Sequence, residues 1–68
     1  MYKNLKAEMS RYNIKNEDIA NKLNITPSTA SLKVNGKARV LVNEAWLIQD
    51  LFLEKVNVNF TIDYLFKI

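Results

Sequence analysis

The strongest constraint on this chain is its single proline and its single glycine, Pro27 and Gly36. Thr26 is a favourable N-cap, and Pro27 follows at the first helical position, where its missing N–H breaks no intrahelical hydrogen bond. Asn35 and Gly36 end the segment, with Gly36 placed to reverse the chain. The pattern predicts a short helix over residues 26–35, and so few turn formers argue against a β-sandwich or barrel.

Apolar residues three and four apart predict four further helices. Ile14 is placed to act as a hydrophobic staple before the second of the five, and Asn24 after it tolerates a left-handed backbone. Thr61 is an N-cap for the last helix. We therefore expect a single all-α domain that takes in residues 1–68. The five predicted helices cover residues 2–12, 16–23, 26–35, 42–53 and 62–66.

The composition excludes several classes of protein. With no cysteine and no histidine in 68 residues, the chain cannot form a disulfide, a thiolate metal site or an imidazole general base. No apolar run is long enough for a signal peptide or a membrane span. We expect a cytoplasmic protein with no cofactor, no metal, no catalytic residues, no membrane association and no small-molecule substrate.

The net charge of +3 is unevenly distributed along the sequence. Residues 19–43 contain no Asp or Glu, whereas residues 44–68 carry four acidic and two basic residues, for a net charge of −2. A basic centre followed by an acidic end is typical of a surface that contacts phosphates. The alternative is an accidental pattern on a solvated surface. The basic residues of the central segment are Lys22, Lys33, Lys37 and Arg39.

The second and third predicted helices have the pattern of a helix-turn-helix, since a tight turn joins two short helices. Ala20 is a small residue at the point where the two helices would cross. Ile25 is the apolar residue of the turn, and Ala30 and Val34 would pack the later helix back on the earlier one. The polar positions between them are left facing outward.

The segment NEDIANKLNITPSTASLKVNGK resembles the helix-turn-helix of the lambda-repressor/Cro-like family, especially its short phage and prophage repressors. NEAWLIQDLF and TIDYLF resemble the fourth and fifth helices of those domains, so the resemblance covers nearly the whole chain. It implies a compact five-helix DNA-binding domain with its helix-turn-helix at about 16–35. Three features depart from the family: Asn24 replaces a glycine, Ala30 replaces a bulkier residue, and Leu41 breaks the capping box with Glu44.

The resemblance implies a transcriptional regulator, of the repressor type, that places residues 26–35 in the major groove of double-stranded DNA. Leu32 can equally contact a thymine methyl group or an apolar residue of the domain itself. No arginine stands on the recognition helix, so we expect modest base discrimination. The implied base contacts are Pro27, Ser28, Thr29, Ser31 and Leu32. The implied phosphate contacts are Asn16, Thr26, Lys33, Asn35, Lys37 and Arg39.

The C-terminal segment contains more apolar residues than one helix face can bury, which indicates a partner. We expect a weak homodimer on a palindromic operator, with half-sites about 34 Å apart. The alternative is that so short a chain needs every apolar residue for its own core. The residues expected at the dimer interface are Trp46, Leu47, Leu51, Leu53, Phe66 and Ile68.

Two other classes of function compete with DNA binding. A protein-interaction module of the same fold, of the antirepressor or antitoxin-like kind, would bind its partner through residues 46–53 and DNA weakly or not at all. An enzyme is the poorest hypothesis, because the chain lacks the side chains and the phosphate-binding loop from which an active site is usually assembled.

Overall fold

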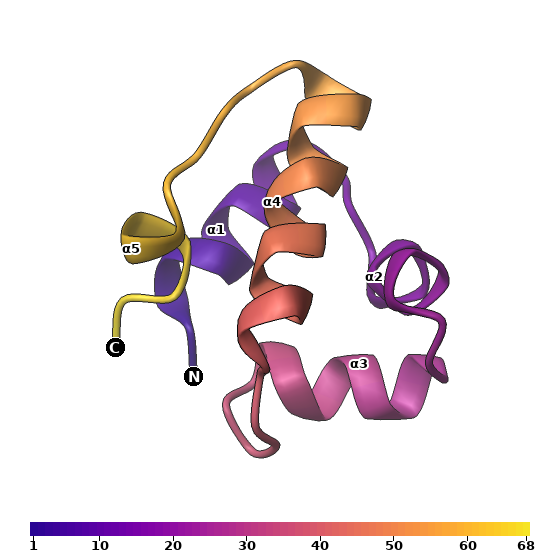
Figure 1. The fold of residues 1–68 in the computed structure, drawn as a ribbon. Helices are drawn as coiled ribbons and strands as arrows, with labels where there is room; N and C mark the ends of the chain where they lie inside the picture. Colours follow the sequence, from indigo (N-terminus) through magenta and orange to yellow (C-terminus); the bar gives the residue numbers. More distant parts are fainter.

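Five α-helices joined by short turns make up the fold in the computed structural model, which describes residues 1–68. No residue forms a β-strand, so the predicted all-α class is confirmed. Helix α4 crosses the middle of the molecule, with α2 on one side, α1 and α5 on the other, and α3 below (Figure 1). The helices are α1 (Lys3–Arg11), α2 (Asn16–Leu23), α3 (Pro27–Val34), α4 (Val42–Val56) and α5 (Ile62–Leu65).

Threonine side chains begin two of these helices, as the sequence predicts. Thr26 Oγ1 accepts a hydrogen bond from the Thr29 N–H at 3.2 Å, and Thr61 Oγ1 accepts one from the Tyr64 N–H at 3.1 Å. Each bond satisfies a backbone donor that the first turn of a helix leaves without an intrahelical partner. Pro27 occupies the first position of α3. The beginning of α3 is therefore fixed by local chemistry.

Residues in the left-handed region end α2 and α4 and follow α3. Asn24 has a φ of 58°, which confirms the prediction at that position, and Asn57 ends α4 with a φ of 56°. Helix α4 continues past its predicted end because Val56 still packs against the core. Gly36 has a φ of 74°, and a Cβ atom there would lie 2.9 Å from the Met1 nitrogen. Any side chain at position 36 would thus be disfavoured by the left-handed backbone conformation and by a clash with Met1.

The beginning of α4 departs from the prediction of a broken capping box. The Leu41 side chain contributes no cap, as expected, but Glu44 Oε1 accepts a hydrogen bond from the Leu41 N–H at 3.0 Å. Asp18 Oδ2 accepts an equivalent bond from the Lys15 N–H at 2.8 Å at the beginning of α2. In each helix the half of the capping box that is present is the bond from the N-cap N–H to the acidic side chain. This bond does not depend on the side chain of the N-cap residue.

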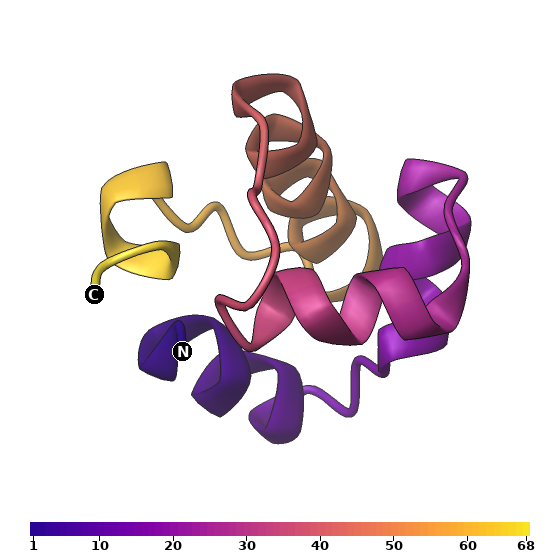
Figure 2. The same cartoon turned by 90° about the horizontal axis from the view of Figure 1, so that it is seen from below.

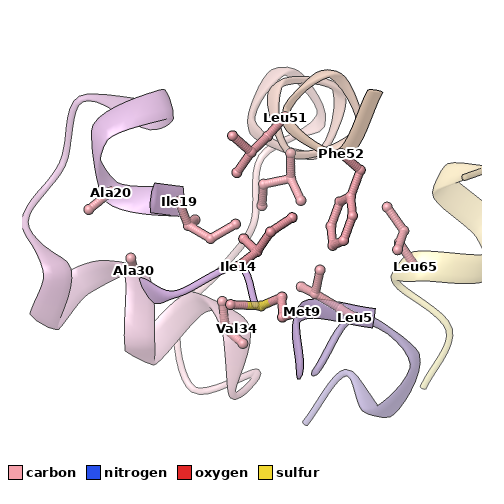
Figure 3. Close-up of a cluster of buried hydrophobic side chains, with 11 residues drawn as sticks. Leu5, Met9, Ile14, Ile19, Ala20, Ala30, Val34, Leu51, Phe52 and Leu65 are labelled. Atoms are coloured by element: carbon pink, nitrogen blue, oxygen red, sulfur yellow. The ribbon is translucent and has the colours of Figure 1, made fainter. Parts of the chain in front are cut away.

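The core contains side chains from all five helices (Figure 3). Ala20 on α2 and Ala30 on α3 are both buried, and their small size lets the two helices approach closely. Ile14 and Ile19 lie in the same cluster, one on each side of the α2 N-cap, as a hydrophobic staple requires. The cluster consists of Leu5, Met9, Ile14, Ile19, Ala20, Ala30, Val34, Ile48, Leu51, Phe52 and Leu65.

Two ion pairs join α2 to α4. Lys22 pairs with Glu54, and Lys55 Nζ lies 3.7 Å from Asp18 Oδ1. These contacts connect the helix that precedes α3 to the longest helix of the fold. No helix is both long and apolar enough to cross a lipid bilayer.

A buried carboxylate connects α1 to α5. The Tyr64 hydroxyl donates a hydrogen bond to Glu8 Oε2 at 2.6 Å, and this bond, together with burial, raises the pKa of the Tyr64 hydroxyl above its ordinary value. Arg11 Nε lies 3.4 Å from Glu8 Oε1, which accepts no hydrogen bond. Asn4 Nδ2 of α1 also donates to the Tyr64 carbonyl at 2.9 Å, so two polar contacts attach the short helix α5 in addition to Leu65 in the core.

Candidate functional site

Helix α3 lies on the outside of the molecule. Seen from below, it lies in front of the other helices, and neither the C-terminal tail nor any other segment covers it (Figure 2). Its inward side consists of Ala30 and Val34, which are both buried. An inward side of only two small residues leaves most of the helix surface to solvent.

The residues predicted to contact bases share this outer surface. Pro27 and Ser28 are exposed, Thr29 and Ser31 are half-buried, and Leu32 is 46% exposed. Contacts within the domain therefore cover only part of Leu32. We call these five residues the α3 face. Its hydroxyl groups can both donate and accept hydrogen bonds, and Leu32 adds an apolar contact point.

The two threonines at the beginning of α3 bond to each other. The Thr26 hydroxyl accepts from the Thr29 N–H and donates to Thr29 Oγ1 at 3.0 Å. The Thr26 hydroxyl donor is therefore used inside the cap, which argues against its predicted role as a phosphate contact. Thr29 retains its own O–H for an external acceptor, as its predicted role requires.

One edge of the α3 face is formed where α1 and the beginning of α2 meet the end of α3. Lys6, Lys15, Asn16 and Asn35 line a pocket of about 330 Å³, with apolar side chains beneath them. Lys6 Nζ donates to Asn35 Oδ1 at 2.9 Å, and Asn35 Nδ2 donates to the Ser31 carbonyl at 2.8 Å. Asn35, a predicted phosphate contact, thus uses both ends of its amide internally and holds Lys6 in place.

Sequence reasoning predicted Asn16 at this edge but missed Lys6 and Lys15. Both lysines belong to segments that are amphipathic or solvated in any case, so nothing local distinguishes them from other surface lysines. The distinguishing feature is the contact between Lys6 and Asn35, which are 29 positions apart in the sequence. Only the packing of α1 against α3 creates that contact.

The other edge is the loop between α3 and α4, which carries Lys37 and Arg39. Both side chains are exposed, and neither forms an ion pair. The N–H groups of Lys37 and Ala38 both donate to the Leu32 carbonyl, at 2.8 and 3.2 Å. The loop is therefore fastened directly to the end of α3, where sequence reasoning expected these two cations.

Lys33 requires a correction, because the structure turns it inward. Its side chain is 12% exposed, and its Nζ donates to the Arg39 carbonyl at 2.8 Å and to Glu44 Oε1 at 2.9 Å. Burial alone would raise the pKa of Glu44. The hydrogen bonds from Leu41 and Lys33 together lower it by more than burial raises it, so the pKa lies below its ordinary value. An ammonium group held by a carboxylate in this way is not free to contact a phosphate, as the sequence had suggested.

The remaining charges concentrate around α3. Four ion pairs use four of the ten basic and four of the seven acidic residues, which leaves six cations and three anions without an ion-pair partner. Four of those cations surround the C-terminal end of α3, and we call them the basic rim: Lys6, Lys15, Lys37 and Arg39. The three anions without a partner are Glu17, Asp50 and Asp63.

The predicted dimer residues divide into three groups. Leu51 is 4% exposed and belongs to the core, so its assignment to an interface is wrong: it follows Ile48 by three positions on the inward side of α4. Trp46 and Leu53 are 57% and 44% exposed, and Ile68 is fully exposed. Leu47 and Phe66 are half-buried.

An apolar groove of about 240 Å³ lies near the chain ends, beside the α3–α4 loop. Every residue that lines it is apolar or aromatic, which is unusual for a surface that faces water. Sequence reasoning anticipated two of its members, Phe66 and Ile68. The lining residues are Tyr2, Val40, Leu41, Val42, Ala45, Ile62, Phe66 and Ile68.

The acidic residues form no group that could hold a metal ion. No protein-family model matches the chain, and no curated protein and no solved structure gives a match either.

Proposed function

We propose that this chain is a helix-turn-helix protein of the lambda-repressor/Cro-like type that binds double-stranded DNA sequence-specifically and regulates transcription, as a repressor of the phage type. In this proposal α2 and α3 form the helix-turn-helix, and α3 enters the major groove. The observation that supports it most strongly is an uncovered polar α3 face beside four cations that have no ion-pair partner in the protein.

Each part of the site has a distinct role in this proposal. Ser28 and Thr29 contact base edges, and Leu32 contacts a thymine methyl group. The basic rim contacts phosphates and fixes the position of α3 on the duplex, but reads no sequence itself. A hydroxyl group can form hydrogen bonds with several different bases, so discrimination between bases at each position is modest. Asn16 adds a phosphate contact at the beginning of α2, where the helix dipole favours an anion.

A titration of labelled duplexes at several salt concentrations tests the proposal. On a half-site duplex that holds one copy, four phosphate contacts predict that log K falls with log salt with a slope of about −4. Lys37→Ala should reduce that slope by about one on every sequence. Lys55→Ala is a control of equal charge at the far end of α4 and should leave it unchanged. Absence of binding to every duplex in a random library, at low salt, would falsify the proposal.

We propose further that the protein binds as a weak homodimer through the apolar groove. The groove is lined in part by the loop that follows the C-terminal end of α3, whereas Ser28 lies in the first turn of that helix. Two copies that meet there extend over about 50 Å, twice the 25 Å length of one copy. A half-site spacing of about 34 Å fits between their outer ends. Only 8 residues line the groove, compared with about 20–30 residues on each side of a standard interface, so the dimer is weak.

The exposed apolar side chains of α4 favour a second candidate, a protein-interaction module. Val42, Trp46 and Leu53 are 68%, 57% and 44% exposed, and they carry no basic residue among them. Such a module would bind a protein partner through α4 and would bind DNA weakly or not at all. The salt titration separates the two candidates, since only DNA binding predicts the steep slope.

A further inference from the structure

We propose that Lys33 and Glu44 form a positioning pair that holds the α3–α4 loop and thereby presents Lys37 and Arg39 to phosphates. This inference rests on the proposed function. Lys33 then contributes to DNA binding indirectly. Glu44 contributes as well, although its negative charge alone would disfavour the binding of an anionic ligand.

The pair is a clamp with contacts on three segments. Lys33 belongs to the last turn of α3, and Glu44 belongs to the first turn of α4. Lys33 Nζ bonds to Glu44 Oε1 at 2.9 Å and to the Arg39 carbonyl at 2.8 Å. The same Glu44 oxygen accepts the Leu41 N–H at 3.0 Å. Two helices and two points of the loop backbone are thus joined at one nearly buried pair, whose side chains are 12% and 13% exposed.

Few other hydrogen bonds hold the second half of the loop. Lys37 and Ala38 are bonded to α3 through the Leu32 carbonyl. From Arg39 to Leu41, the only other backbone hydrogen bond is the one that the Leu41 carbonyl accepts from Ala45 as α4 begins. The position of Arg39 therefore depends on the clamp, and so does the path of the loop that carries Lys37.

Positioning and simple electrostatics predict opposite effects when Glu44 is removed. Electrostatics alone predicts tighter binding to DNA, because the net charge rises from +3 to +4 and the Lys33 ammonium is released toward the phosphates. Positioning predicts weaker binding, because the loop loses its anchor and two cations of the basic rim lose their fixed geometry. The sign of the change separates the two explanations.

The DNA experiment compares Glu44→Ala with Glu17→Gln, which neutralises an exposed acidic residue that has no ion-pair partner. Glu17→Gln should tighten binding slightly at low salt. Glu44→Ala should weaken binding by about fivefold or more and reduce the salt slope by one to two, although both variants gain the same charge. A thermal melt of each variant identifies a temperature at which both variants are folded, and DNA binding is measured at that temperature. A role in stability alone would leave the slope of the folded protein unchanged and would overturn the proposal.

Tighter binding by Glu44→Ala, with a slope steeper by about one, also overturns the proposal, because it would mean that Lys33 itself contacts phosphate once released. Lys33→Arg is the rescue variant: a guanidinium group can restore the pair, so binding should remain within about twofold of the original protein.

A measurement without DNA keeps the inference separate from the proposed function. Lys33→Met retains the aliphatic stem and leaves Glu44 in place as the acceptor for the Leu41 N–H. Hydrogen exchange of the Leu41 amide should nevertheless become about tenfold faster, because the acceptor has lost its anchor. The Ile14 amide, bonded to the Met9 carbonyl at 2.8 Å, is the internal control and should not change. Unchanged exchange at Leu41 overturns the clamp, whereas absence of DNA binding by the original protein overturns only the function.

Discussion

The α3 face and the outer side of α4 are both open to solvent, yet their chemistry is opposite. The α3 face carries hydroxyl groups, lies beside four cations without ion-pair partners, and has a single large apolar residue, Leu32. The outer side of α4 carries Trp46 and Leu53, with Asp50 as a nearby anion. A polyanion is attracted to the first surface and repelled by the second. One small fold can thus present two open surfaces that differ in charge.

Removing the whole basic rim is the strongest way to break this comparison. A variant with Lys6, Lys15, Lys37 and Arg39 all changed to alanine should lose affinity for duplex DNA by on the order of a hundredfold at moderate salt. Its salt slope should approach zero, and its helical circular dichroism should not change, because none of the four side chains is buried. A slope still near −4 would mean that phosphates meet another surface.

A smaller effect is expected from the α3 face. Ser28→Ala combined with Thr29→Ala removes two hydroxyl groups that can contact bases, and the cap formed by Thr26 Oγ1 and the Thr29 N–H remains. Preference for the best sequence over a random one should fall by about tenfold, with little change in salt slope. Selection from a random duplex library measures this directly. If the double variant selects the same sequences as the original protein, α3 does not read bases.

The apolar groove provides a test of the dimer. Ile68→Asp places a charge in the groove without touching the core, since Ile68 is fully exposed. Sedimentation velocity should show less self-association, and affinity for a palindromic site should fall several-fold while binding to a half-site is unchanged. Trp46→Ala is the matched control outside the groove. If Trp46→Ala disrupts self-association and Ile68→Asp does not, the interface lies on α4 instead.

The smallest expected effect concerns stability at acid pH. The pKa of Glu44 is lower in the folded protein than its ordinary value of 4.5. The ionised carboxylate therefore stabilises the fold above pH 4.5, and this contribution is lost as the pH falls below 4.5 through the folded value. Glu44→Gln should melt at a lower temperature than the original protein at pH 7, and the difference should shrink toward pH 3. A constant difference would show that the charge of Glu44 is not what stabilises the fold.

Features that depend on neighbours in the sequence were predictable. The Thr26–Pro27 beginning of α3, the left-handed Asn24 and the position of Gly36 each follow from the conformational preference of one residue and the donors next to it. Such preferences act over a few positions, so the sequence alone specifies them. The all-α class followed from the same kind of information.

Features that depend on the direction of a side chain were harder to predict. Lys33 and Lys37 are both basic and four positions apart, yet one is held by Glu44 and the other faces solvent. Leu51 and Trp46 are both apolar members of α4, yet only Leu51 is in the core. The direction of Lys33 depends on Glu44 in another helix, which local patterns do not reveal. The burial of Leu51, in contrast, agrees with its position three residues after the buried Ile48 on one side of α4.

The contact between Gly36 and Met1 has a practical consequence for anyone who attaches a probe to this protein. Met1 lies against Gly36, just after the C-terminal end of α3. A dye or fusion partner joined at Met1 would therefore lie close to the loop that carries Lys37. A probe at Ile68 would instead sit at the apolar groove. Asn57 and Asn59 are exposed in the turn that follows the C-terminal end of α4 (Figure 1). A probe attached there would leave the loop that carries Lys37 and the apolar groove accessible.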